Sequence, residues 1–379
     1  MTAFGSSGVR GVANEDLTPA DVLAIAQAAG SVLDADRMAL ARDTRATGGT
    51  FADAVASGLA SVGADVDRLG VVPTPGLQVY CEREGVPGVM VTASHNPPEY
   101  NGVKFLPADG APALPPVTDA IVDRLADPSP TDGAYGTITE ADLVGPYLGH
   151  ARRFVDADLN GLRVAYDAMH GSGRDVTDRL LERAGAKVDR LRCEQDDEFG
   201  GTAPEPTAER VPDLIERVTE GEADLGVVND GDADRIGVVT PERGYLDPNL
   251  FFAAMYDFLL EDASGDVVRT VSTSSIVDRV AEAHGQAVHE VAVGFKWVAE
   301  AMAEHDALFG GEESGGFGLP DHLRNKDGVL VALVAAAAEH EEPLDARVDR
   351  LLDEHGEIHQ NRISVDCPDD RKEPVLREL

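Results

Sequence analysis

Val89-Met-Val-Thr-Ala-Ser-His-Asn-Pro-Pro-Glu-Tyr-Asn-Gly-Val-Lys104 is the stretch of this 379-residue chain around which its fold and its candidate chemistry are organised. The short apolar run from Val89 to Val91 leads into a loop dense in turn-forming residues. Pro97 and Pro98 each fix a φ angle and remove a backbone donor, so the loop is predicted to be rigid and irregular. A rigid loop after a buried strand suits a reactive side chain, here the Ser94 hydroxyl. A plain surface turn is the alternative, and this loop alone does not decide between them.

Helix and strand patterns alternate on both sides of this loop. Thr18-Pro19 has the N-cap and first-position proline that open a helix, and a second helix is expected over about 51–63. Strands are expected at 38–42, 69–72 and 86–91, and the first two end in polar or Pro-containing loops, Asp43–Gly49 and Pro73–Gly76. This alternation predicts an α/β fold with mixed, largely parallel sheets, whose ligands bind beyond the carboxyl ends of the strands.

The pattern restarts twice and then breaks off. Further strands are expected at 162–167, 187–191, 224–229, 267–271 and 287–291, and helices at about 208–220, 248–261 and 275–284. We therefore predict three consecutive similar α/β domains, 1–148, 149–246 and 247–356. Residues 357–379 begin a strand at 361–365 but are too short to bury a core, so they are predicted to begin an incomplete fourth domain. The Pro-, Ala- and Asp-rich stretches 107–118 and 127–133 are predicted to be exposed connections.

The formal charge of −37, from 69 acidic and 32 basic residues, is extreme for a folded protein. The acidic residues are spread along the chain, and only five of the basic residues are lysine. The periodic apolar segments argue against an acidic disordered chain. Spread acid and scarce lysine instead favour a halophilic surface, on which salt screens the self-repulsion. The same charge excludes nucleic acid as a partner and requires an anionic substrate to meet locally gathered bases.

Targeting and assembly signals are sparse. The sequence contains no apolar run long enough to span a membrane, and its first residues lack the pattern of a signal peptide, so we expect no membrane association and a cytoplasmic location. Cys81, Cys193 and Cys367 are far apart and are predicted to be reduced. We expect a monomer or a weak homo-oligomer.

Asp230, Asp232 and Asp234 place three carboxylates within one short loop after an apolar strand. Alternate side chains of an extended turn point the same way, so all three can converge on Mg²⁺ or Ca²⁺. A calcium helix–loop–helix is excluded, because Arg235 and Pro241 stand where it needs Gly and Glu. An ordinary acidic turn remains the alternative. Arg235 beside the carboxylates favours an anion carried on the metal.

Ser94 is a candidate nucleophile or phosphoryl carrier. No catalytic triad is expected there, because the side chains of Ser94 and His95 should point apart. A phosphate on Ser94 would add about two negative charges and complete an oxygen shell with the aspartates. Lys104 and Arg10 could neutralise the rest, Arg10 from the glycine-rich entry loop Phe4–Gly11.

Glu312 and Ser314 lie in the glycine-rich loop Gly310–Gly316. A carboxylate and a hydroxyl at this spacing could bind vicinal sugar hydroxyls. A generic turn is the alternative.

Together these motifs resemble the α-D-phosphohexomutase family, which includes phosphoglucomutase, phosphomannomutase and phosphoglucosamine mutase. The resemblance covers nearly the whole chain and keeps the order FGSSGVRG, TASHNPPEYNGVK, DGDADR, GFKW and GEESGG. It implies a phosphoserine at Ser94 and one Mg²⁺ per chain, held by that phosphate and by Asp230, Asp232 and Asp234. The remaining implied roles are Arg10 and Lys104 as bases beside the phosphoserine, Arg235 as the base after the metal loop, Lys296 facing the substrate, and Glu312 and Ser314 binding the sugar's O3 and O4.

The resemblance also implies a reaction that moves a phosphoryl group between O1 and O6 of a hexose phosphate. The intermediate would be a bound 1,6-bisphosphate, with a glucose 1,6-bisphosphate-type activator. Domains 1–148, 149–246 and 247–356 would carry the phosphoserine, metal-binding and sugar-binding loops, and 357–379 would begin the phosphate-binding domain. Lys104 would carry the proton if neighbouring bases lower its pKa. The alternatives are a phosphoglucosamine mutase of the same mechanism, a metal-dependent phosphatase and a non-catalytic phosphosugar-binding fragment.

Two departures from the family pattern affect these expectations. Some bacterial members carry His where this chain has Phe295 and Gly316, which leaves the sugar preference and part of the proton handling open. No loop resembling the family's Arg-Pro-Ser-Gly-Thr-Glu-Pro follows Val365. We therefore expect a truncated chain with weak substrate binding and low mutase turnover. Glucose and mannose phosphates differ only at C2, and no residue is predicted to recognise that carbon.

Overall fold

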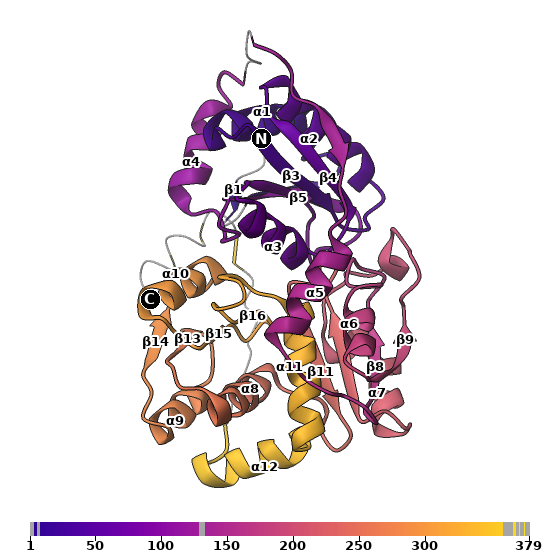
Figure 1. Cartoon of the computed structure of the whole chain (residues 1–379), viewed down its shortest axis with the longest axis vertical. Helices are drawn as coiled ribbons and strands as arrows, with labels where there is room; N and C mark the ends of the chain where they lie inside the picture. Colours follow the sequence, from indigo (N-terminus) through magenta and orange to yellow (C-terminus); the bar gives the residue numbers. More distant parts are fainter. Residues whose placement is uncertain are drawn as a thin grey trace.

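Separate β-sheets follow one another along the chain in the computed structural model, which describes residues 4–5, 8–128, 133–358, 367–368, 371 and 375. The described residues form sheets of seven, five and four strands. In Figure 1 the first sheet occupies the upper part of the molecule, the second lies at the lower right and the third at the lower left. The predicted α/β class with mixed sheets is confirmed.

The first sheet combines a parallel half with an antiparallel half. Its strands are, in spatial order, β1 (Phe4–Gly5), β2 (Gly8–Val12), β6 (Tyr100–Leu106), β5 (Gly88–Val91), β3 (Arg37–Arg42), β4 (Asp65–Val71) and β7 (Ile138–Glu140). The helices of this part are α1 (Pro19–Leu33), α2 (Gly48–Ser61), α3 (Thr74–Glu84) and α4 (Pro115–Arg124). Helix α5 (Val144–Phe154) follows and packs between α3 and the second sheet's helix α6 (Thr177–Arg183). The predicted start of α1 is confirmed, because the Thr18 amide donates to Asp21 Oδ2 at 2.9 Å and the Asp21 amide donates back to Thr18 Oγ1 at 3.3 Å.

Two stretches of this part differ from their predictions. The connection expected over 107–118 contains the start of α4 at Pro115, whose ring is tolerated in a first helical turn, and Ile121 of α4 is fully buried. The loop expected at Pro73–Gly76 becomes the first turn of α3, with Pro75 in that turn. Residues 129–132 of the other predicted connection lie outside the described residues.

The second and third sheets are smaller. The second contains β12 (Gly244–Tyr245), β11 (Ile236–Thr240), β10 (Leu225–Asn229), β8 (Arg163–Asp167) and β9 (Lys187–Leu191), with α6 (Thr177–Arg183), α7 (Pro212–Thr219) and the 3₁₀ turns η1 (Phe199–Gly201) and η2 (Ala208–Arg210). The third contains β14 (Val288–Val291), β13 (Val267–Thr270), β15 (Phe309–Gly311) and β16 (Phe317–Gly318), with α8 (Pro248–Asp262), α9 (Ile276–Ala283) and α10 (Phe295–His305). The last helices are α11 (Gly328–Glu341) and α12 (Leu344–His355).

One arrangement recurs in all three sheets. The strand before each candidate loop pairs with a parallel neighbour on one side. The strand after the loop turns back and pairs antiparallel with it on the other side. The Ser94 loop joins β5 to β6, the Asp230 loop joins β10 to β11, and the Glu312 loop joins β15 to β16. The three loops therefore leave corresponding edges of three similar sheets.

Helix α11 connects the second and third sheets and fixes the residues before it. Its residues from Gly328 to Ala338 are all buried, as expected for a helix that is apolar on every side. The Asp327 carboxylate caps it by accepting the amides of Val329 and Leu330 at 3.0 and 2.8 Å. This cap holds Lys326 beside the junction of the three sheets.

The remaining predictions about the chain's layout are not decided by these elements. The boundaries at 148, 246 and 356 stay predictions. The strand expected at 361–365 lies outside the described residues. Within the part of the chain that the structure describes, every helix is too short or too polar to cross a lipid bilayer.

Candidate active site

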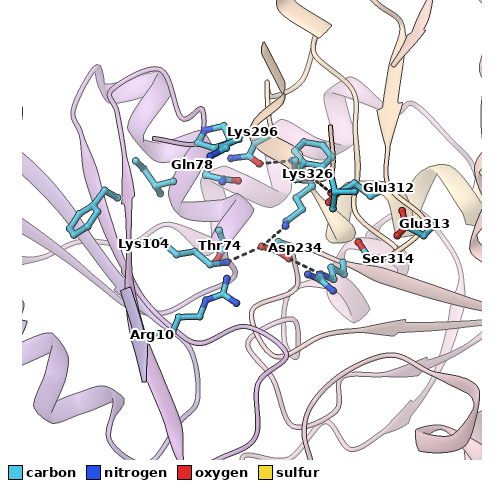
Figure 2. Close-up of a pocket in the computed structure, with 18 residues that line it drawn as sticks. Arg10, Thr74, Gln78, Lys104, Asp234, Lys296, Glu312, Glu313, Ser314 and Lys326 are labelled. Atoms are coloured by element: carbon cyan, nitrogen blue, oxygen red, sulfur yellow. Dashed lines mark hydrogen bonds and ion pairs between the residues drawn. The ribbon is translucent and has the colours of Figure 1, made fainter. Parts of the chain in front are cut away.

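A cavity of about 320 Å³ opens where the three sheets meet. This volume lies at the lower end of the range of about 300–1,000 Å³ that is usual for small-molecule sites. Figure 2 shows side chains from all three parts of the chain around it. The predicted site residues that line it are Arg10, Lys104, Asp234, Arg235, Lys296, Glu312 and Ser314. Ser94 donates to Asp230, which accepts the Arg235 amide, and Asp232 accepts Lys104 Nζ, so the structure brings the whole predicted set together.

Ser94 is buried and points at the acidic loop of the second sheet. Its Oγ donates to Asp230 Oδ2 at 2.8 Å, and its amide donates to Thr92 Oγ1 at 2.8 Å. The Ser94 φ angle of +53° lies in the left-handed region, which is strained for a residue other than glycine. The surrounding loop must therefore hold this conformation.

Arg45 supplies that restraint, although no motif in the sequence marks it. Its buried guanidinium pairs with Asp43 Oδ2 at 3.0 Å. The same group donates to four backbone carbonyls of the serine loop at 2.6–2.9 Å, those of Ser94, Asn96, Pro97 and Tyr100. The polar loop Asp43–Gly49 was visible in the sequence, but its contact with residues about fifty positions away was not.

The three aspartates converge as predicted. Oxygen atoms of Asp230, Asp232 and Asp234 all lie within 4.8 Å of one another, and the three residues are buried. Among the described residues, the Oδ1 atoms of Asp232 and Asp234 have no hydrogen-bond partner. Buried carboxylate oxygens without a partner are costly, and hard oxygen donors suit Mg²⁺ or Ca²⁺. The residues present therefore fit a divalent cation better than a solvated acidic turn.

The acidic group divides into one carboxyl with a raised pKa and two with a lowered pKa. Burial, followed by the charges of Asp232 and Asp234, raises the pKa of Asp230 well above its usual value. Burial also acts to raise the pKa of Asp232, but Lys104 outweighs it, and the net pKa lies below the usual range. Burial and Asp232 act to raise the pKa of Asp234, but Lys104 and Lys326 contribute to holding it below its usual value.

Lys104 is tied to the same carboxylates. Its Nζ donates to Asp232 Oδ2 at 2.6 Å and to Asp234 Oδ2 at 2.9 Å. Burial acts to lower the pKa of Lys104, but the two carboxylates outweigh it and the net pKa is raised. The expected lowering by neighbouring bases is therefore wrong for this arrangement, because Asp232 and Asp234 raise the pKa of Lys104 more than Arg10 lowers it. Lys104 is a protonated donor here.

Thr74 and Lys326 are further members of the site that were not predicted from the sequence. Thr74 Oγ1 donates to Asp232 Oδ2 at 2.6 Å, and the Thr74 amide donates to the Asp232 carbonyl at 2.9 Å. Lys326 Nζ lies 3.5 Å from Asp234 Oδ2. Lys326 is one of only five lysines and directly precedes the Asp327 cap of α11, a signal that could have indicated it.

Phe295 and Gly316 form the surface against which Lys326 lies. The Lys326 Nζ is 5.7 Å from the centre of the Phe295 ring. A Cβ atom added at Gly316 would lie 3.0 Å from Lys326 Cδ, so the absence of a side chain there gives the lysine its space. Three of the five lysines, with Arg10 and Arg235, line the cavity, as expected for a site that gathers scarce bases.

His95 lies closer to Ser94 than predicted. Its Nδ1 is 3.4 Å from Ser94 Oγ, because the left-handed conformation of Ser94 turns the two side chains toward each other. Burial, followed by the charges of Arg235 and Arg10, lowers the pKa of His95 to about 3. A histidine with so low a pKa is a poor general base, so this contact does not make a catalytic triad.

The third sheet contributes the opposite wall. Glu312 is buried and its Oε1 accepts the Gly294 amide at 3.1 Å, while Ser314 is exposed. Lys296 Nζ lies 4.8 Å from the centre of the Trp297 ring. These side chains reach the cavity from β15–β16 and α10 (Figure 2).

Comparisons with known proteins agree with this arrangement. Family models match the chain in three consecutive pieces: phosphoglucomutase/phosphomannomutase alpha/beta/alpha domain I over residues 1–131, domain II over 146–244 and domain III over 247–355. The chain is 37% identical over 384 residues to a protein of Methanopyrus kandleri named "Probable phosphoglucosamine mutase", with 99% of this chain and 83% of that protein covered. It is 34% identical over 388 residues to the phosphoglucomutase/phosphomannomutase of Thermococcus kodakarensis, with 99% and 84% covered.

A solved structure shows the same fold. The phosphoglucomutase/phosphomannomutase family protein of Burkholderia thailandensis superposes with a TM-score of 0.83 at 25% identity, covering 93% of this chain and 80% of that one. The three matched domains and the identity to relatives over nearly the whole chain lead to one conclusion. This chain belongs to the phosphoglucomutase/phosphomannomutase family of phosphohexomutase enzymes.

Proposed function

We propose that this protein interconverts a hexose 1-phosphate and a hexose 6-phosphate through a phosphoserine at Ser94 and a bound 1,6-bisphosphate. The observation that carries the proposal is the hydrogen bond of 2.8 Å between Ser94 Oγ and Asp230, one of three convergent buried carboxylates. A hydroxyl at this position is both the phosphoryl acceptor and a future oxygen donor to the cation.

The reaction takes place in two transfers. In the first, the bond between phosphorus and Ser94 Oγ breaks while a bond to the free sugar hydroxyl forms, giving the 1,6-bisphosphate. In the second, the other phosphate returns to Ser94 Oγ after the intermediate has turned over. Phosphoryl transfer depends mainly on positioning and charge neutralisation, which this rigid and basic site provides.

Each residue has a role that its contacts support. Lys104, protonated and held by two carboxylates, gives a proton to Ser94 Oγ as the phosphoryl group leaves, and its amine then takes up the proton that the attacking sugar hydroxyl has lost. In the second transfer Lys104 protonates the sugar oxygen from which the phosphoryl group departs and takes up the proton that Ser94 Oγ loses. Arg10 neutralises the phosphoserine from the first sheet. A Mg²⁺ ion, one per chain, would be held by Asp230, Asp232, Asp234 and the phosphate on Ser94, and would supply charge that stabilises the phosphoryl oxygens.

The substrate is held between the first and third sheets. Glu312 and Ser314 bind the vicinal O3 and O4 hydroxyls, and Arg235, Lys296 and Lys326 bind phosphate oxygens. We propose that domains 1–148, 149–246 and 247–356 carry the phosphoserine, metal-binding and sugar-binding loops. Relatives are named as mutases of glucosamine phosphate and as phosphoglucomutase/phosphomannomutase, so turnover is to be measured with glucose, mannose and glucosamine phosphates side by side.

One experiment separates this function from its rivals. A mutase is activated by glucose 1,6-bisphosphate, yields both hexose phosphates, and loses this activity with EDTA until Mg²⁺ is restored. A metal-dependent phosphatase releases inorganic phosphate instead, and a non-catalytic phosphosugar-binding fragment shows no exchange. Either of these outcomes would overturn the proposal.

We also propose that the protein is adapted to high salt. The 69 acidic and 32 basic residues support this, because their repulsion weakens as salt shortens the screening length.

A further inference from the structure

Gln78 is a buried side chain of the cavity to which no role has been assigned. It lies on α3, one helical turn after Thr74 and therefore on the same face of the helix. Its side chain is only 2% exposed, and it lines the cavity between the first and third sheets. Figure 2 shows Gln78 and Thr74 on the same helix, at the cavity that Lys326 also lines.

The amide of Gln78 is unusual because its oxygen has no partner. Of the described residues that line the cavity, Gln78, Asp234 and Arg235 have a buried side-chain atom without a hydrogen bond. Asp234 and Arg235 are charged and belong to the metal and phosphate groups. Gln78 is the neutral member, and its Oε1 lacks a donor.

Asn325 provides the contrast. It is the other side-chain amide of the same cavity, but its Oδ1 accepts the Lys326 amide at 2.9 Å and its Nδ2 donates to the Gly110 carbonyl at 3.4 Å. Asn325 is therefore held within the protein, whereas the buried Oε1 of Gln78 has no donor from the protein. Leaving such a buried oxygen unpaired destabilises the free protein, and a ligand hydroxyl or amine that donates to it would relieve this cost.

Given the proposed function, elimination identifies the sugar group that can donate a hydrogen bond to Gln78 Oε1. In a hexopyranose phosphate, O1 and O6 are the reacting positions, and Glu312 and Ser314 take O3 and O4 from the third sheet. The ring oxygen carries no hydrogen, so it cannot donate to Gln78 Oε1. The substituent at C2 is the donor that is left.

We infer that the Gln78 amide binds the C2 hydroxyl or amino group of the substrate and thereby sets which hexose phosphates the site accepts. This inference rests on the proposed function, because the elimination uses the roles of Glu312 and Ser314. Gln78 is then the residue that distinguishes sugars differing at C2.

The test uses 2-deoxyglucose 6-phosphate, which lacks the C2 group of glucose, mannose and glucosamine 6-phosphates alike. Binding is measured by calorimetry on the full chain without Mg²⁺, for wild type, Gln78→Leu and Gln78→Met. The wild type is expected to bind its preferred hexose 6-phosphate about 3- to 10-fold more tightly than the 2-deoxy compound, the value of one neutral hydrogen bond. Both variants should bring this ratio close to one while leaving the affinity for the 2-deoxy compound unchanged.

Two controls guard against an indirect effect. Gln286→Leu makes the same change at a half-buried glutamine just before β14, whose Nε2 donates to the His284 carbonyl at 3.3 Å, and should keep the wild-type ratio. The melting temperatures of both Gln78 variants should equal or exceed that of the wild type, because an unpaired polar atom has been removed.

Three results would overturn the inference: a wild-type ratio of one, an unchanged ratio in the Gln78 variants, or equal weakening of both ligands, which would indicate a contact elsewhere on the sugar phosphate. Turnover is scored separately. Gln78-dependent discrimination without mutase exchange would reject the proposed function alone, whereas exchange with no dependence on Gln78 would reject this inference alone.

Discussion

Replacing Arg45 tests whether the serine loop must be held rigidly for phosphoryl transfer. Arg45→Met removes five interactions of one buried guanidinium, the ion pair with Asp43 and the hydrogen bonds to four carbonyls. Breaking a buried ion pair by removing one partner costs about 3–5 kcal/mol, so this variant should be strongly destabilised. Arg45→Lys keeps the charge beside Asp43 but loses the planar fork, so it cannot reach all four carbonyls.

The lysine variant is therefore the informative one. Misplacing a reacting group by about 1 Å can cost about 100-fold in rate, so we expect kcat of Arg45→Lys to fall about 100-fold. KM should change little, because the sugar-binding residues of the third sheet are untouched. The assays are bisphosphate-dependent mutase kinetics, the rate of Ser94 phosphorylation by mass spectrometry, and thermal unfolding.

Arg347→Lys is the matched control for this prediction. Arg347 is also a buried arginine, and its Nη1 donates to Asp257 and Glu261 at 2.6 Å each, away from the cavity. Its lysine variant should lose stability but keep kcat. Wild-type kcat in Arg45→Lys, or an equal loss in both variants, would refute the proposed positioning role.

Three further predictions address charge. Lys326→Met should lower kcat/KM about 10- to 100-fold, because a hydrogen bond to a charged group contributes about 1.5–3 kcal/mol; unchanged steady-state kinetics would contradict a role in phosphate binding. Burial raises the pKa of Glu339 from 4.5 to about 7 in the folded protein. The folded state therefore loses stability as the pH rises from the pKa of the unfolded chain to that of the folded one. Glu339→Gln should melt higher than wild type at about pH 8 but not at about pH 4, and equal melting temperatures at about pH 8 would contradict this. Raising KCl from about 0.1 M to about 2 M should increase the melting temperature and keep the protein folded, since the Debye length falls from about 10 Å to below 3 Å; a melting temperature that does not depend on salt would reject the high-salt adaptation.

Local patterns predicted much of the fold. The strand expected at 187–191 coincides with β9, and the helix start at Thr18-Pro19 is confirmed by the reciprocal cap. Where prolines open a helix, as in α3 and α4, the same residues were interpreted as loops, because a first-turn proline and a turn proline look alike. Helix α11 shows the limit of periodicity, since a helix buried on every side has no polar face to mark it.

The candidate site also contains residues that the sequence predicted and residues that it did not. Ser94 and the three aspartates lie within contiguous motifs, and the structure brings Ser94 Oγ to 2.8 Å from Asp230 and the three carboxylates within 4.8 Å of one another. Arg45, Thr74, Gln78 and Lys326 were missed because their importance depends on which distant segment folds against them. The pKa of Lys104 was misjudged for the same reason, because the sequence does not show that two carboxylates are its nearest neighbours.

The central claim is that Ser94 carries the phosphoryl group between substrate molecules. The most direct measurement is to incubate the chain with Mg²⁺ and ³²P-labelled glucose 1,6-bisphosphate, locate the label by peptide mapping, and then add unlabelled hexose 6-phosphate. We predict that the label is found on Ser94, is absent in Ser94→Ala, and moves into the hexose phosphates after the addition. Label that never reaches Ser94, or that leaves it only as inorganic phosphate, would contradict the account.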